Sequence, residues 1–86
     1  MKLFGYSFSM RFRLFNMQFG SVKEFDAADP ADACSKVETF FNRSMPPFEL
    51  RIVDVRGASW YIEKINRRDG IRAPYRIDQV RGEATK

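Results

Sequence analysis

The residues from Asp29 to Ser44 constrain the fold most, because they predict an amphipathic helix that needs an apolar surface to pack on. Asp29 suits the N-cap position, Pro30 suits the first helical position, and Asp32 stands where a capping-box carboxylate would lie. At about 100° per residue, an arc of about 120° is apolar and consists of Ala33, Cys34, Val37, Phe40 and Phe41. The opposite side is polar, and two consecutive prolines, residues 46–47, end the helix. The rest of the chain must therefore supply an apolar face.

Alternation of apolar and polar residues before this helix predicts two strands. Every second residue from Phe4 to Leu14 is apolar, and the residues between them are glycine, serine or arginine. This period of two is typical of a strand with one apolar face. A bulge or a turn near Asn16 would explain why the next apolar residues change phase, namely Phe15, Met17 and Phe19. Residues 21–26 then form a short strand that leads into the helix.

Three more strands are predicted after the helix. Residues 48–55 alternate, with a change of phase at Val53, and residues 56–59 form a turn. Residues 59–69 allow either a return strand at 60–65 or a second helix capped by Ser59; the strand is favoured, because the apolar residues make an incomplete helical stripe. After a charged loop, Pro74 suits the start of an edge strand that continues from Tyr75 to Val80.

These elements give the order β-β-α-β-β-β. One amphipathic helix on one face of an antiparallel sheet of four to five strands is an α+β two-layer sandwich. The chain of 86 residues has room for one domain, which we assign to residues 1–80, with a frayed tail at 81–86. No apolar run approaches the roughly 20 residues of a membrane span, and polar residues interrupt any signal-peptide core, so we expect a soluble cytoplasmic protein without membrane partners.

The composition argues against the common catalytic and metal sites. There is no histidine and one cysteine, Cys34, so a zinc site of thiolates and imidazoles and a Ser-His-Asp or Cys-His nucleophile are excluded. Asp26, Asp29 and Asp32 are spaced by three, unlike the ligands of a calcium loop, and the glycines are too scattered for a phosphate-binding loop. We expect a non-enzymatic protein without cofactor or metal, in which Cys34 is a buried, inert side chain.

Positive charge is concentrated toward the C-terminus. Residues 1–50 hold six basic and six acidic residues, whereas residues 51–86 hold nine and five, so the whole formal charge of +4 lies in the second part. Ten of the fifteen basic residues are arginine, which makes bidentate contacts to phosphate or carboxylate and stacks on aromatic rings. Basic and aromatic residues are interleaved here, and the candidate binding residues are Trp60, Lys64, Arg67, Arg68, Arg72, Tyr75 and Arg76.

These residues favour a small binding module that contacts nucleic acid or a nucleoprotein complex through its C-terminal hairpin, by phosphate contacts and base stacking. The alternative is a protein-directed inhibitor or adaptor, of the kind that mobile elements or phages carry as accessory proteins, which would bind an acidic protein surface through the same arginines. A third candidate is an enzyme subunit that needs residues of a partner. The apolar residues that are out of phase are candidates for a homodimer face: Phe15, Met17 and Phe19.

Overall fold

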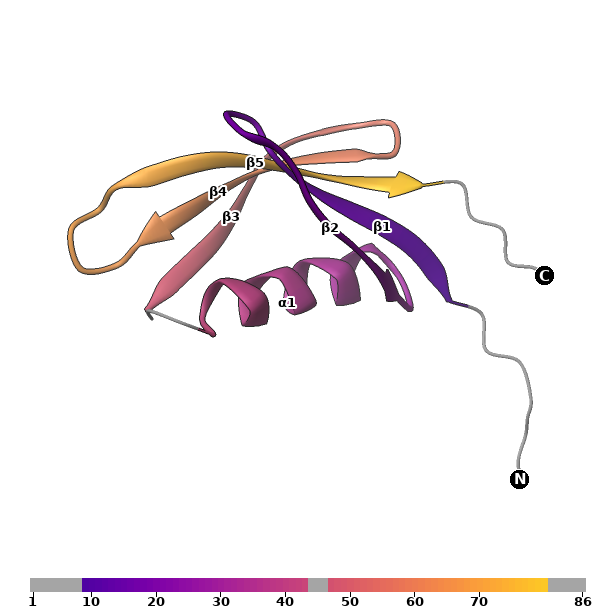
Figure 1. Cartoon of the computed structure of the whole chain (residues 1–86), viewed down its shortest axis with the longest axis horizontal. Coiled ribbons are helices and arrows are strands. Elements are labelled where there is room, and N and C mark those ends of the chain that lie inside the picture. Colours follow the sequence, from indigo (N-terminus) through magenta and orange to yellow (C-terminus); the bar gives the residue numbers. More distant parts are fainter. Residues whose placement is uncertain (1–8, 44–46, 81–86) are drawn as a thin grey trace, which may run out of the picture.

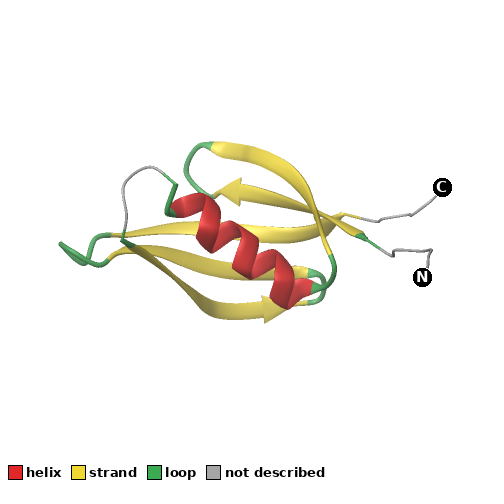
Figure 2. Ribbon diagram, turned by 90° about the horizontal axis from the view of Figure 1, so that it is seen from below, coloured by secondary structure: helices red, strands yellow, loops and turns green. Residues whose placement is uncertain are grey.

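The computed structural model describes residues 9–43 and 47–80, which contain one helix and five strands (Figure 1). In chain order they are β1 (Met10–Asn16), β2 (Gly20–Ala27), α1 (Pro30–Phe41), β3 (Phe48–Arg56), β4 (Ser59–Asn66) and β5 (Arg72–Val80). The strands form one antiparallel sheet, and α1 lies across one of its faces (Figure 2). The predicted α+β two-layer sandwich is confirmed. The predicted tail at 81–86 and the beginning of the first predicted strand, at 4–8, lie outside the described residues.

The strand order β2-β1-β5-β4-β3 places the last strand in the middle of the sheet. Since β5 pairs with β1 on one side and with β4 on the other, the prediction of an edge strand beginning at Pro74 is wrong. The N–H of Met17 donates to the carbonyl of Pro74 (3.0 Å), so Pro74 faces the residue that follows the end of β1 at Asn16. A strand residue directs its N–H and its C=O to the same neighbour. The N–H that proline lacks would therefore point toward Met17, past the last residue pair of the β1–β5 ladder, Asn16 and Tyr75.

Both changes of phase in the strand pattern have a structural cause. β1 is regular up to its end at Asn16, so Phe15 lies on the face opposite to Leu14, and the turn that follows carries Met17 and Phe19. The bulge in the β1–β2 ladder lies in β2, where Val22 is the extra residue. The Asn16 side-chain oxygen accepts the N–H groups of Gln18 and Phe19 (2.8 and 3.1 Å), which fixes the predicted turn. In the β3–β4 ladder the extra residue is Val53. Residues 59–69 form β4 and a turn, so the strand was the correct choice over a second helix there.

α1 has the predicted cap and the predicted apolar face. The N–H of Asp32 donates to the Asp29 carboxylate (2.8 Å), and the Asp32 carboxylate accepts the N–H of Ala28 (2.9 Å), so both acids bind main-chain donors at the helix start. The helix ends at Phe41, three residues before the predicted end, and Ser44 lies outside the described residues. The buried core joins α1 to four of the strands and comprises Phe12, Leu14, Ala27, Ala33, Val37, Phe41, Ile62 and Ile77.

The outer edge of β3 is closed to another strand along its first half. The Asn42 amide accepts the N–H of Phe48 (2.7 Å) and donates to its carbonyl (3.1 Å), and the Glu38 carboxylate accepts the N–H of Leu50 (3.4 Å). The bulge at Val53 then interrupts the regular strand. Sheets avoid edge-to-edge association by bulges and by covering the main-chain N–H and C=O groups of their edge strands. A homodimer formed by pairing of two β3 edges is disfavoured.

Candidate nucleic-acid interface

The residues that the sequence suggests as one binding surface lie in three different places. Trp60, Lys64 and Tyr75 share the sheet face with the core residues Ile62 and Ile77, and this face is covered by α1. The β4–β5 turn and the start of β5 carry the next group: Arg67, Arg68 and Arg72. Arg76 lies on the opposite face of the sheet, which we call the open face. The structure therefore keeps Arg67, Arg68 and Arg72 together. It separates them from the two aromatic residues, Trp60 and Tyr75.

Lys64 is part of the packing between α1 and the sheet. Its ammonium nitrogen lies 4.3 Å from the ring centroid of Phe48, 5.0 Å from that of Phe41 and 6.0 Å from that of Tyr75. An ammonium near aromatic faces is attracted by the partial negative charge of those faces, by about 0.5–2 kcal/mol per pair. The cation that the sequence offered for phosphate binding is thus engaged by rings of β3, α1 and β5.

Trp60 is half-buried and also contacts the core. It is paired with the buried Ile77, and its ring centroid lies 6.3 Å from that of Phe12. Tyr75 is packed in the same way, with its ring 4.9 Å from that of Phe41. Both rings face α1, so a base that stacked on them would lie on the far side of the sheet from Arg76.

The β4–β5 turn is held by several hydrogen bonds and presents two exposed arginines. Asn66 accepts the N–H of Arg68 through its side chain (2.9 Å) and the N–H of Gly70 through its carbonyl (2.7 Å). The N–H of Arg67 donates to the carbonyl of Pro47 (3.1 Å), which ties the turn to the start of β3. Gly70 has φ of 76°, a conformation that glycine adopts without strain. The backbone beneath the two guanidinium groups is therefore ordered.

We call Arg67, Arg68 and Arg72 the arginine turn. Within residues 9–43 and 47–80, Arg67 and Arg68 form no ion pair, and Arg72 has one exposed contact, to Glu63 at 3.5 Å. The carboxylate of Asp69, which lies in the same turn, accepts the N–H of Ile71 (2.9 Å). Two full positive charges are thus left facing solvent at one end of the sheet.

The open face carries arginines that are already paired. Arg76 donates to Asp78 (2.8 Å) and its guanidinium lies 4.5 Å from the ring centroid of Phe15; the bond to Asp78 raises the pKa of Arg76. Arg13 and Arg11 both bond to Glu24, and these bonds, chiefly the one from Arg13, lower the pKa of that carboxyl. A face of alternating, paired charges offers a phosphate backbone little net attraction.

Two of the three apolar residues that are candidates for a homodimer face, Phe15 and Met17, both contact Arg76. Phe15 lies beneath Arg76 on the open face, whereas Phe19, in the β1–β2 turn, is 85% exposed. Met17 lies beside Arg76, with its sulfur 4.0 Å from a guanidinium nitrogen. One open-face pair was not predicted from the sequence: the Arg56 guanidinium lies over the ring of Tyr61, 5.6 Å from its centroid. Only the strand register reveals that these two residues meet.

Cys34 lies on the predicted side of α1 and is half-buried against the core. Burial raises the pKa of its thiol, and the nearby Glu38 carboxylate adds to the rise. Since the thiolate is the reactive form, we expect a soluble thiol reagent at pH 8 to label the native protein several-fold more slowly than the protein in guanidinium chloride. Equal rates in the two conditions would show that Cys34 is an exposed, ordinary thiol.

The part of the chain that the structure describes contains no group of three or more acidic or cysteine residues placed to hold a metal ion. It also contains no helix that is long and apolar enough to cross a membrane. No protein-family model, no curated protein and no solved structure matches this chain.

Proposed function

We propose that this protein is a small non-enzymatic binding module that contacts nucleic acid, free or within a nucleoprotein complex, through the arginine turn. The observation that supports the proposal is the pair of exposed guanidinium groups, Arg67 and Arg68, on a turn whose backbone is fixed by hydrogen bonds. Guanidinium groups bind phosphate oxygens in a bidentate manner, and an ordered backbone lowers the entropy lost on binding. The contacts are to the backbone of the nucleic acid, so little sequence specificity is expected.

The salt dependence of binding tests this proposal. If the three cations of the arginine turn meet phosphates of duplex DNA, log K should fall with log salt at a slope of about −2.7. A fourfold rise in salt would then weaken binding about 40-fold. Replacing Arg67 and Arg68 with alanine should remove about 1.8 of that slope, as measured by fluorescence anisotropy with a labelled duplex.

The matched control removes two arginines from the open face, Arg11→Ala with Arg13→Ala. It changes the net charge by the same amount, but both residues are paired with Glu24. We expect it to leave the slope nearly unchanged. If both double variants lost the same slope, net charge alone would govern binding. If the unmodified protein did not bind DNA at low salt, the proposal would be wrong.

The second candidate, a protein-directed inhibitor or adaptor, is favoured by one observation on β3. Ile52, Val53 and Val55 are 48%, 55% and 52% exposed, so three aliphatic side chains within four residues of an edge strand are open to solvent. Apolar side chains rimmed by arginine are typical of protein interfaces. A pull-down repeated after nuclease treatment separates the two candidates. A partner that survives nuclease and is lost with Val53→Asp favours this one.

A further inference from the structure

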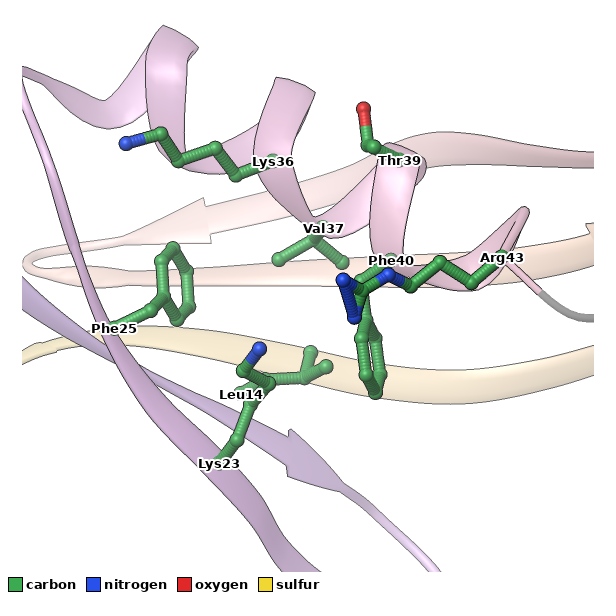
Figure 3. A pocket seen from close by; sticks show the side chains of 8 residues that line it. All are labelled: Leu14, Lys23, Phe25, Lys36, Val37, Thr39, Phe40 and Arg43. Carbon is green, nitrogen blue, oxygen red and sulfur yellow. The ribbon is translucent and has the colours of Figure 1, made fainter.

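A groove with a cavity volume of about 220 Å³ lies between α1 and the β1–β2 hairpin, away from the arginine turn (Figure 3). Its apolar lining consists of Leu14, Phe25, Val37 and Phe40. Its polar lining consists of Lys23, Lys36, Thr39 and Arg43. None of these residues is acidic, so an apolar floor is combined with a positive mouth.

The register of β2 explains why the sheet is open here. Lys23 pairs with the fully buried Leu14, so a lysine occupies a position of the helix-covered face where alternation would otherwise place a core residue. The Lys23 ammonium lies 4.7 Å from the ring centroid of Phe40 instead of filling the space. In Figure 3 the Lys23 ammonium and the Arg43 guanidinium are directed toward the space between Phe25 and Phe40. The gap in the packing is therefore lined by charge at its mouth.

Two of the polar lining residues are already engaged. Lys36 donates to the carbonyl of Asp26 (3.0 Å) and lies 3.5 Å from the Asp32 carboxylate. Thr39 donates its hydroxyl to the carbonyl of Ser35 within α1 (3.1 Å). Lys23 and Arg43, by contrast, form no ion pair within the described ranges 9–43 and 47–80. Their charges are available to a ligand.

We propose that this groove binds a small amphipathic carboxylate, an alkyl or aryl acid. The carboxylate contacts Arg43 and Lys23, and the apolar body lies between Phe25 and Phe40 above Leu14. A guanidinium matches a carboxylate in a bidentate manner, and buried apolar area supplies the rest of the affinity. The groove volume is that of about seven molecules of liquid water. It is larger than the roughly 150 Å³ cavity that holds benzene and smaller than the pocket that a drug-sized ligand needs. An acid of about eight carbons fits this size.

The test is a titration of the full-length, ¹⁵N-labelled protein with octanoate, followed by amide chemical shifts. We expect saturable shifts centred on Lys23, Phe25 and Phe40, and much weaker binding of octanol and octylamine, which share the chain but lack the negative charge. Equal binding of the three compounds would overturn the proposal. So would shifts confined to the amides of β3, because octanoate would then be acting as a detergent on the exposed side chains of Ile52, Val53 and Val55.

Two double variants locate the charge requirement. Lys23→Gln with Arg43→Gln should weaken octanoate binding about tenfold or more, since charge-assisted hydrogen bonds are lost. The control, Arg51→Gln with Arg56→Gln on β3, removes the same charge outside the groove and should bind octanoate normally. Unchanged melting temperatures show that the variants fold. Arg67→Ala with Arg68→Ala should keep octanoate binding, so failure of this proposal and failure of nucleic-acid binding are distinguishable. Octanoate affinity that is insensitive to the Lys23 and Arg43 changes would overturn the assignment.

Discussion

Phe12→Ala is expected to lower the free energy of unfolding by about 3–5 kcal/mol, the largest loss that we predict for one side chain. Phe12 is fully buried on the helix-covered face of β1, and its ring lies 5.9 Å from that of Phe25 and 6.3 Å from that of Trp60. Truncation would leave a cavity in the core between α1 and the sheet, which the neighbouring side chains could close only if the backbone moved. Urea denaturation followed by circular dichroism measures the loss.

Phe15→Ala is the matched control, because it removes the same ring from the same strand but from the open face. Phe15 is half-buried, and its main partner is the guanidinium of Arg76. We expect a loss of about 1–2 kcal/mol, from partial burial and one cation–π contact. A loss at Phe15 equal to that at Phe12 would contradict the assignment of the two faces.

Ile77→Ala should lower the free energy of unfolding by about 2–5 kcal/mol, although it lies in the last strand of the chain. Ile77 is 1% exposed in β5 and is paired with Leu14 on one side and Trp60 on the other. Val53→Ala on the edge strand β3 should cost less than about 1 kcal/mol, because Val53 is about half-exposed.

Hydrogen exchange independently tests whether β5 is a central strand. Amides of a central strand exchange only when the whole domain opens, whereas edge strands open locally. We expect the amide of Ile77 to be among the slowest to exchange and those of Ile52 and Val53 to be fast. Rapid exchange throughout β5, together with a small effect of Ile77→Ala, would place β5 at an edge and refute the strand order.

The helix could be predicted from the sequence because its determinants are local. Asp29, Pro30 and Asp32 lie within four residues at the start of α1. The two acids make the capping contacts that their residue types suggest. The apolar face follows from the 3.6-residue period alone. The strands were visible for the same reason, since a period of two shows in any short window, and the bulge at Val53 appears as a change of phase.

The candidate site could be predicted only in part. The arginine turn follows from three basic residues beside an Asp-Gly pair, which are neighbours in the sequence. The prediction also assigned Trp60, Lys64 and Tyr75 to this surface, but in the sheet these three residues lie on the face that α1 covers. Alternation indicates that Tyr75 and Arg76 point to opposite faces, but it does not reveal which face a helix will cover. The cage of three rings around Lys64 involves residues from β3, α1 and β5, so no local pattern shows it.

Tertiary structure alone decided the order of the strands and the position of the groove. A strand's residues specify that it pairs, but main-chain ladders are nearly alike for every partner, so the choice depends on how all the apolar faces are buried together. Inserting β5 between the two hairpins buries Ile77 against Leu14 and makes Pro74 a residue of a central strand. In the same way, Lys23 lies at the mouth of a groove because the β1–β2 register places it opposite Leu14. The sequence by itself determined the helix, the strands and their two faces, because these depend on neighbours in the chain. The partners of those faces depend on residues far apart in sequence, and only the folded sheet brought them together.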